Sequence, residues 1–158
     1  MNNEMNNNSM TTEIPFMVLI AGSRTVTKNS PRYSEQYEKA YSEISKMITR
    51  DIKSVAGDRY SIVIVSGGAT GVDSIAEDYA RRNDYRLIVF PANWKKFGAS
   101  AGFIRNEEMH RFIAKYPHRV VLCYKDKQSK GKGTSHSIEL GKKYNNEVIW
   151  NDIDSTQW

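Results

Sequence analysis

One glycine-rich segment constrains the fold more than any other part of the chain. It runs from Ser66 to Asp73 with the sequence SGGATGVD, and it follows the β-branched run 60–65. Apolar residues with helical spacing resume at Val72, so the pattern predicts a strand, a tight loop and the N-terminus of a helix. Glycine allows close approach to a ligand, and the first N–H groups of a helix have no internal partner. The segment is therefore a candidate site for an anion such as phosphate.

Two well-known phosphate motifs do not fit this segment. The loop of nucleoside triphosphatases requires Lys and then Ser or Thr after its last glycine, whereas Gly71 is followed by Val72 and Asp73. The dinucleotide fingerprint G-x-G-x-x-G needs a residue between its first two glycines, but Gly67 and Gly68 are adjacent. Taken alone, the segment is also compatible with a turn whose glycines only allow a strand and a helix to pack.

Four more apolar runs have the length and composition of buried strands. They lie at 16–21, 85–90, 119–124 and 147–150. Between the runs, apolar residues recur with helical spacing, for example after a capping Ser34 and up to Gly57, and in a short helix expected over 137–143. This alternation predicts an α/β fold, a Rossmann-like doubly wound parallel sheet of about five strands with helices on both faces.

Length and composition predict one globular domain. The chain has 158 residues, of which 39% are hydrophobic and 26% charged. We expect a disordered N-terminal tail at 1–13, a single Rossmann-like domain at 14–152 and a C-terminal tail at 153–158. No apolar run approaches the roughly 20 residues that span a bilayer, and the N-terminus lacks a signal-peptide pattern. A cytoplasmic protein without membrane contact is therefore expected.

Cysteine and histidine give no sign of a metal site. Cys123 is the single cysteine and lies within an apolar run, so we expect a buried thiol that acts as a small hydrophobe. His110, His118 and His136 have no metal-ligand spacing with one another or with Cys123. We expect no metal and no cofactor, and we expect His110 and His118 to be surface or interface residues.

The candidate site residues follow the predicted strands. In an open parallel sheet, ligands bind beyond the carboxyl ends of the strands, where all the loops rich in glycine, proline or basic residues lie. Arginine there can bind an anion, an amide can contact a ribose or a base, and a tryptophan can stack. The candidates are Gly22, Ser23, Arg24, Ser66, Gly67, Gly68, Gly71, Asp73, Trp94, Arg105, Asn106, Gly131, Gly133, Thr134 and His136. The formal net charge of +5 suits an anionic ligand and equally suits weak contact with nucleic acid.

Four motifs of the chain occur together in one known superfamily. They are Gly22-Ser23-Arg24, the segment 66–73, the segment 101–106 with Met109, and Gly133-Thr134. Together they resemble the SLOG superfamily, whose Rossmann-like domains bind nucleotides and nucleotide-derived signals. The nearest likeness is to small phage and bacterial single-domain proteins related to the YpsA group. The resemblance implies a nucleotide-binding fold and also a homo-oligomer, because relatives commonly assemble.

A second likeness implies an alternative function. The stretch from Arg105 to Met109 is similar to the Arg-Lys-x-x-Met helix of the Lonely Guy phosphoribohydrolases, which cleave an N-glycosidic bond. Ser137 stands where that family has its catalytic glutamate, and a serine hydroxyl supplies no charge to an oxocarbenium-like state. If the protein is an enzyme of this kind, its catalytic residues would be Arg105, Glu108 and Asp73.

A third likeness is to the DNA-processing protein A family, whose Ser-Gly-x-Ala-x-Gly-Ile-Asp stretch resembles the segment 66–73. That likeness implies single-stranded DNA binding, although few stacking aromatics accompany the basic loop here. The leading hypothesis is a module that senses or sequesters a nucleotide or a nucleotide-derived, ADP-ribose-like molecule. The arginines and glycine loops would then hold phosphate, with Asp73 and Asn106 on ribose or base and Trp94 stacking.

Overall fold

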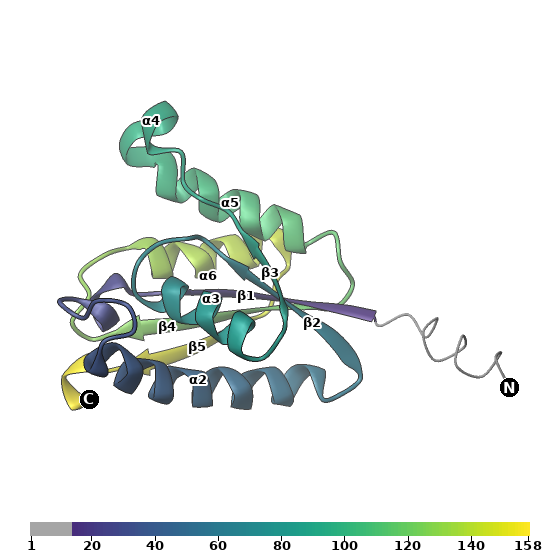
Figure 1. The fold of residues 1–158 in the computed structure, drawn as a ribbon. Helices are drawn as coiled ribbons and strands as arrows, with labels where there is room; N and C mark the ends of the chain where they lie inside the picture. The colour runs from purple at the N-terminus through teal and green to yellow at the C-terminus, as the bar shows by residue number, and fades with distance from the viewer. Residues whose placement is uncertain (1–13) are drawn as a thin grey trace, which may run out of the picture.

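The sheet at the centre of the molecule has five parallel strands. A computed structural model, which describes residues 14–158, places them in the order β3-β2-β1-β4-β5 (Figure 1). The strands are β1 (Ile14–Gly22), β2 (Tyr60–Ser66), β3 (Arg86–Val89), β4 (Arg119–Asp126) and β5 (Val148–Ile153). The first two crossovers run to one side of β1 and the later ones to the other, so the strand order reverses between β1 and β4. The predicted Rossmann-like parallel sheet is confirmed.

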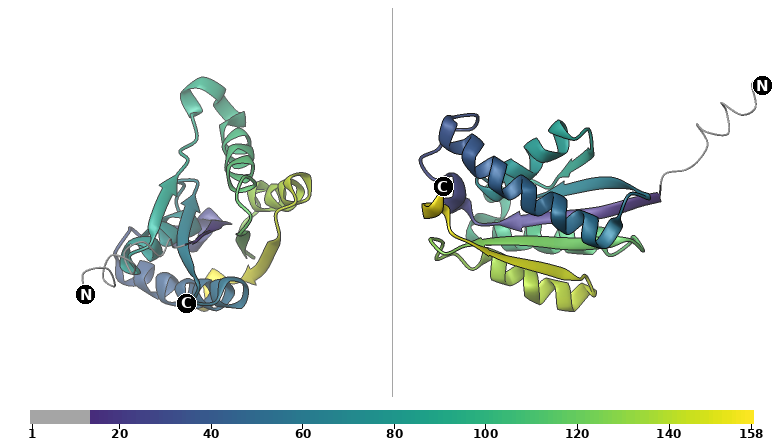
Figure 2. Two further views of the ribbon diagram at one scale, coloured as in Figure 1. Left: turned by 90° about the vertical axis from the view of Figure 1, so that its right-hand side faces the viewer. Right: turned by 90° about the horizontal axis from the view of Figure 1, so that it is seen from below.

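Helices cover both faces of the sheet, as predicted (Figure 2). They are α2 (Glu35–Ala56), α3 (Val72–Arg82), α4 (Trp94–Phe97), α5 (Ala101–Ile113) and α6 (Gly133–Tyr144), with short 3-10 helices η1 (Arg24–Thr27), η2 (Gly98–Ser100) and η3 (Ser155–Gln157). The pair α2 and α3 packs on one face, and the pair α5 and α6 packs on the other. Within residues 14–158, no helix has the length and apolar character needed to cross a membrane.

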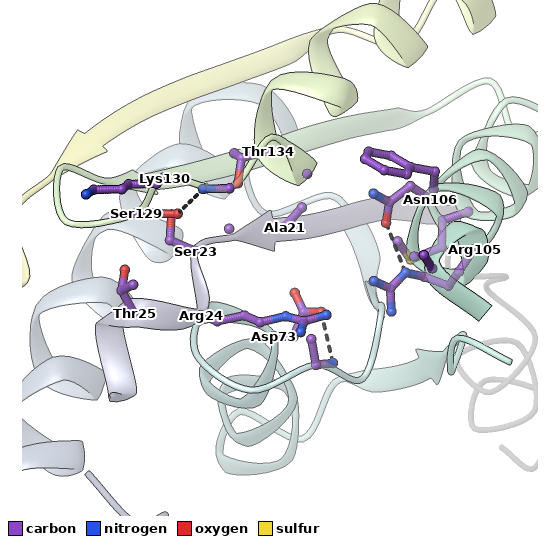
Figure 3. Close-up of a pocket in the computed structure, with 18 of the residues that line it drawn as sticks. Ala21, Ser23, Arg24, Thr25, Asp73, Arg105, Asn106, Ser129, Lys130 and Thr134 are labelled. Carbon is purple, nitrogen blue, oxygen red and sulfur yellow. Dashed lines mark hydrogen bonds between the residues drawn. The ribbon is translucent and has the colours of Figure 1, made fainter. Parts of the chain in front are cut away.

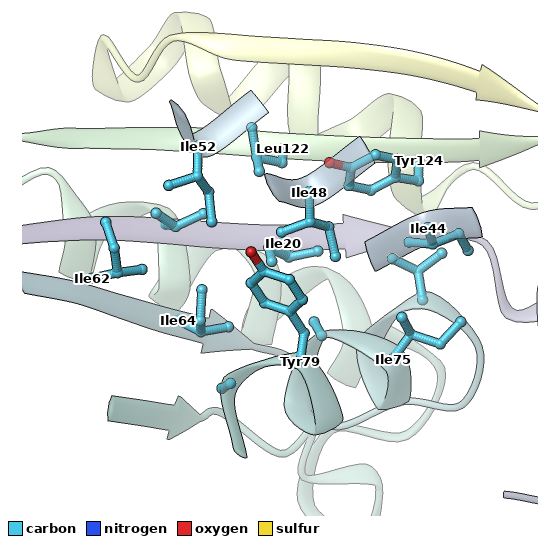
Figure 4. Close-up of a cluster of buried hydrophobic side chains, with 14 of the residues drawn as sticks. Ile20, Ile44, Ile48, Ile52, Ile62, Ile64, Ile75, Tyr79, Leu122 and Tyr124 are labelled. Atoms are coloured by element: carbon cyan, nitrogen blue, oxygen red, sulfur yellow. The ribbon is translucent and has the colours of Figure 1, made fainter. Parts of the chain in front are cut away.

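The larger core lies between the sheet and helices α2 and α3 (Figure 4). The apolar stripe of α2 supplies Ile44 and Ile48, which have no exposed surface. The helix begins as predicted, because the Ser34 hydroxyl accepts a hydrogen bond from the Tyr37 N–H at 3.2 Å. It ends at Gly57, whose φ of 59° few other residues adopt. Apolar periodicity and the two capping residues therefore predicted the bounds of this helix correctly.

The smaller core lies on the opposite face, beneath α5. Met109 and Ile113 of this helix pack against the sheet residues Leu19, Val65 and Cys123. The thiol of Cys123 is buried, as predicted, and burial raises its pKa to about 12. This cysteine is thus protonated at neutral pH and contributes packing.

Two local predictions differ from the structure. His110 is not a surface residue: its side chain has no exposed area, because Asn146 covers it and donates hydrogen bonds to its Nδ1 and its main-chain oxygen. Burial lowers the pKa of His110 to about 4, so it is neutral at pH 7. The second difference concerns α6, which begins at Gly133 rather than at Ser137. The polar residues of its first turn carry no apolar periodicity that would have predicted this start.

The segment 153–158, expected as a tail, is packed against the fold. Ile153 is the last residue of β5 and is buried. The main-chain N–H and hydroxyl of Ser155 donate to the Asp126 carboxylate at 3.0 and 2.7 Å. Trp158 packs against the larger core. The ordered part of the domain therefore continues beyond residue 152.

The glycine-rich segment fits closely against the loop that follows β1. Gly71 has a φ of 81°, and a Cβ there would lie 2.4 Å from the Ser23 carbonyl oxygen and 2.5 Å from the Arg24 Cα. The Val72 N–H donates to the same carbonyl at 3.2 Å. Because there is no room for a side chain at position 71, glycine is required for α3 to begin against this loop.

Replacing Gly71 by alanine should destabilise the fold more than the matched change at Gly57. Both glycines combine a positive φ with a strongly negative ψ, −130° and −143°, so backbone strain of about 1–3 kcal/mol applies to both. A Cβ at Gly57 would meet nothing within 4 Å. We expect Gly71→Ala to lower the free energy of unfolding by about 2 kcal/mol more than Gly57→Ala in urea denaturation. Equal losses would contradict the close fit.

Candidate functional site

A cavity of about 420 Å³ opens beyond the carboxyl end of β1, between the segments that follow β2 and β4 (Figure 3). Its volume is in the range of small-molecule sites. It lies where the strand order reverses, which is the ligand position in open parallel sheets. The lining residues are Ala21, Gly22, Ser23, Arg24, Thr25, Ala69, Asp73, Trp94, Ala99, Gly102, Phe103, Arg105, Asn106, Met109, Ser129, Lys130, Gly131, Gly133 and Thr134.

Arg105 of α5 brings a buried positive charge to the cavity. The residue is 8% exposed, its Nη1 donates to the Gly67 carbonyl, and its Nε donates to the Asn106 side-chain oxygen at 2.9 Å. Burial lowers the pKa of Arg105 below its ordinary value, and the nearby Asp73 charge opposes that shift. Its Nη2 has no acceptor among residues 14–158. This N–H group therefore remains available to a ligand.

Asp73, in the first turn of α3, is the one carboxylate among the described residues that line the cavity. It is 6% exposed, and its Oδ2 accepts a hydrogen bond from the Ala69 N–H at 3.1 Å. Burial raises the pKa of Asp73 to about 6, while the bond from Ala69 and the charge of Arg105 partly offset this effect. Within the described chain, the other carboxylate oxygen accepts no hydrogen bond from protein. That oxygen is free to accept from a ligand hydroxyl.

Arg24 and Trp94 stand at the mouth of the cavity. Figure 3 shows the Arg24 side chain reaching toward Asp73. The Arg24 guanidinium carbon lies 5.8 Å from the centre of the Trp94 ring, which is a cation–π distance. Trp94 and Phe103 are both large, apolar and about half exposed. The mouth therefore combines an exposed positive charge with aromatic surface on which a planar group can stack.

The wall that follows β4 is polar and is held in place by Asp126. The Asp126 N–H donates to the Ser23 hydroxyl at 2.9 Å, and its carboxylate accepts from the Thr25 hydroxyl at 2.6 Å. Lys125 donates to the Ser129 carbonyl at 2.6 Å. The two Asp126 bonds tie the segment after β1 to the end of β4, and the Lys125 bond holds the loop that follows β4. The wall comprises Ser129, Lys130, Gly131, Gly133 and Thr134.

Most of the residues predicted to bind a ligand come together in this lining. They are Gly22, Ser23, Arg24, Asp73, Trp94, Arg105, Asn106, Gly131, Gly133 and Thr134. The remaining candidates do not line the cavity: Ser66, Gly67, Gly68, Gly71 and His136. Glu108, named with Arg105 and Asp73 as a possible catalytic residue, is exposed and also lies outside the lining.

Small residues of the glycine-rich segment lie outside the lining and contact the residues that form it. The Ser66 hydroxyl donates to the Asp73 carbonyl and accepts from the Gly68 N–H, both at 3.3 Å. A Cβ at Gly67 would lie 2.8 Å from the Arg105 guanidinium carbon. The segment thus positions Arg105 and Asp73, and only Ala69 and Asp73 of it face the cavity.

Sequence reasoning missed several lining residues. Lys130 belongs to the basic loop that the sequence displays, so a signal for it existed. Thr25 is held at the cavity by its hydrogen bond to Asp126, a residue distant in sequence, which no local pattern reveals. Ser129 accepts a hydrogen bond from the nearby Lys125 and lies in the same loop as Lys130. Phe103 lines the cavity as well, and His136 packs edge-on against its ring with centroids 4.8 Å apart. His136 is therefore placed behind Phe103.

The charges of the lining favour an anionic ligand. Arg24, Arg105 and Lys130 are basic, whereas Asp73 is acidic with a pKa raised to about 6. In the part of the chain that the structure describes, no three His, Cys, Asp or Glu side chains gather closely enough to hold a metal ion. Positive charge in a partly enclosed, low-dielectric site attracts phosphate more strongly than the same charge in water.

The pH dependence of stability should reveal the buried Asp73 carboxylate. Because its pKa rises from 3.8 to about 6 on folding, its charged form destabilises the folded state. Relative to Asp73→Asn, the unmodified protein should lose up to about 3 kcal/mol of stability as pH rises from about 4 to about 7. Below this window Asp73 is protonated in both states and the penalty is absent. Urea denaturation across this range measures the difference, and parallel pH profiles would contradict the assignment.

Three comparisons with known proteins relate the chain to others. It matches the family described as YAcAr, "YspA, cpYpsA-related SLOG family", over residues 16–97, which is just over half of its length. It is 32% identical to the Gene 61 protein of Mycobacterium phage D29 over 95 residues, covering 57% of this chain and 71% of the phage protein.

The third comparison is structural. A CE1 ferulic acid esterase, AmCE1/Fae1A of the fungus Anaeromyces mucronatus, is 13% identical and aligns over 91% of this chain and 73% of the esterase. Its TM-score is 0.28, so this likeness carries no argument about the fold or the function. The family match spans β1 to α4, including Arg24, the glycine-rich segment and Trp94. The chain belongs to the YspA, cpYpsA-related SLOG family.

Proposed function

We propose that the protein binds a nucleotide or a nucleotide-derived, ADP-ribose-like ligand in this cavity, as a sensor or a sequestering module. The observation that carries the proposal is the meeting of two arginines with one buried carboxylate at the carboxyl edge of a Rossmann-like sheet. Membership of a SLOG family supports a nucleotide-related ligand. Separate parts of such a ligand contact separate walls of the cavity.

A phosphate fits best between Arg24 and Arg105. Arg105 offers its free Nη2, and the exposed Arg24 can turn its guanidinium toward the same anion. Lys130 and the main chain near Gly131 and Gly133 add positive charge and close backbone approach from the facing wall. Hydrogen bonds between charged partners in such a setting each contribute about 1.5–3 kcal/mol.

Ribose and base fit the other groups. The free oxygen of Asp73 accepts hydrogen bonds, as a pair of ribose hydroxyls requires. The Asn106 side-chain oxygen is occupied by Arg105, which leaves the Asn106 amide nitrogen as a donor toward a base or sugar acceptor. Trp94 presents an exposed ring on which a base can stack, an interaction worth about 1–3 kcal/mol per base.

The placement of the carboxylates supports binding over hydrolysis. Ser137, which stands in the position of the Lonely Guy glutamate, is 2% exposed and lies outside the cavity lining. Glu108 is outside the lining too. Among the described residues that line the cavity, Asp73 is the one carboxylate that could stabilise an oxocarbenium-like state, and its Oδ2 accepts a hydrogen bond from the Ala69 N–H. This placement supports the proposal that the ligand is retained intact.

Removing the exposed arginine at the mouth should weaken nucleotide binding without harming the fold. Arg24 makes no hydrogen bond to another described residue, so Arg24→Ala should keep the melting temperature of the free protein. We expect it to weaken binding of AMP by about 10-fold or more in isothermal titration calorimetry, since one charge-assisted contact is lost. Arg111→Ala is the matched control, because Arg111 is an exposed arginine of α5 outside the cavity. Equal effects of the two changes would contradict the assignment.

The ligand itself should be recoverable from the protein. We expect heating of the purified protein to release an intact nucleotide that mass spectrometry identifies, and we expect AMP, NAD or ADP-ribose to raise the melting temperature in proportion to occupancy. Conversion of an added nucleotide to base and sugar phosphate would instead indicate hydrolysis. Affinity for single-stranded DNA that falls steeply with salt, without any response to nucleotides, would overturn the proposal in favour of DNA binding.

A further inference from the structure

A second cavity lies on the other side of Arg24. It has a volume of about 690 Å³ and is bounded by η1, the loop that follows it and the first turn of α3. Its lining includes Thr27, Lys28, Thr70 and Ser74. None of these four residues lines the first cavity. The function proposed above makes no use of this space.

The two cavities are neighbours built from the same two segments. Arg24 and Thr25 line both of them. Ala69 and Asp73 line the first cavity. The residues that follow them in the chain, Thr70 and Ser74, line the second cavity. Adjacent residues of the same two segments therefore line the two cavities. A ligand that passes over Arg24 would reach from one cavity into the other.

The second cavity has a different chemistry from the first. Among residues 14–158, its lining contains no carboxylate, and its one aromatic residue is the buried Tyr37. Arg32 in its wall is already neutralised, because it donates to the buried Asp78 carboxylate at 2.6 Å. Lys28 is exposed and forms no ion pair within residues 14–158, so its charge is available. Thr27 and Thr70, which carry hydroxyls, line the same cavity. Such a lining suits the phosphate and hydroxyl groups of a sugar rather than a stacked base.

We propose that the second cavity is a subsite for a second, sugar-phosphate half of the ligand. The ligand class is then a nucleotide that carries a further sugar through a phosphate bridge. Its base-bearing half occupies the first cavity near Trp94, the phosphate bridge crosses Arg24, and the distal sugar lies against Lys28 and Thr70. This inference rests on the proposed function and names the class of ligand that the site is shaped to take.

The experiment compares AMP with ADP-ribose as probes by isothermal titration calorimetry. We expect ADP-ribose to bind at least about 10-fold more tightly than AMP, and Lys28→Ala to remove most of that advantage while leaving AMP affinity unchanged. The matched control is Lys115→Ala, which removes an exposed lysine after the end of α5. It should change neither affinity. Because Lys28 is exposed, the variant should fold as the unmodified protein does, which its melting temperature checks.

A second measurement places the distal half of the probe directly. In two-dimensional amide NMR, signals of Lys28, Asn29 and Thr70 should shift with ADP-ribose and stay in place with AMP. Equal affinities for the two probes, or an ADP-ribose advantage that Lys28→Ala leaves intact with these signals unmoved, would overturn the subsite while the first cavity keeps its role. If neither probe binds, the proposed function fails along with the subsite.

Discussion

The site depends on the hydrogen bonds that replace the lost hydration of one buried guanidinium, that of Arg105. Arg105 loses most of its hydration on folding, and an unpaired charge in that position would be costly. The Gly67 carbonyl and the Asn106 side chain accept two of its hydrogen bonds, and Asp73 lies near enough to oppose its loss of charge. The same bonds connect α5 to the glycine-rich segment across the cavity. Compensation is incomplete, since Nη2 still lacks an acceptor in the described chain, and this is the group left for a ligand.

Glycine serves this arrangement mainly by leaving room. The sequence predicts that the glycines at 66–71 hold a phosphate with their backbone, but the structure places Gly67 under Arg105 and Gly71 under the Ser23 carbonyl. A side chain at either position would displace a group that lines the cavity or supports its wall. The positive charge at the cavity therefore comes from arginine side chains whose close approach the glycines allow, which differs from a loop that wraps a phosphate in N–H groups.

The fold was more predictable than the site because its signals are local. Apolar runs and a helical stripe ending at Gly57 are properties of neighbouring residues, and they identified the five strands and the helices α2 and α3. His110 is bonded to Asn146, which lies in a distant segment, so no pattern near His110 predicts its burial. The first turn of α6 has no apolar periodicity, so the sequence did not predict where this helix begins. For the cavity, motif residues were found, whereas Thr25 was missed because only its bond to Asp126 brings it there.

Asp126 shows how the end of the chain shapes the cavity at its centre. Its carboxylate accepts from Thr25 on one side and from Ser155 on the other, and its N–H donates to Ser23. Burial alone would raise the pKa of Asp126, but the bonds from Thr25 and Ser155 keep it below its ordinary value. A single carboxylate thus joins η3, the segment after β1 and the wall after β4. Because Thr25 lines both cavities, the network that holds the wall after β4 also holds a residue that the two cavities share.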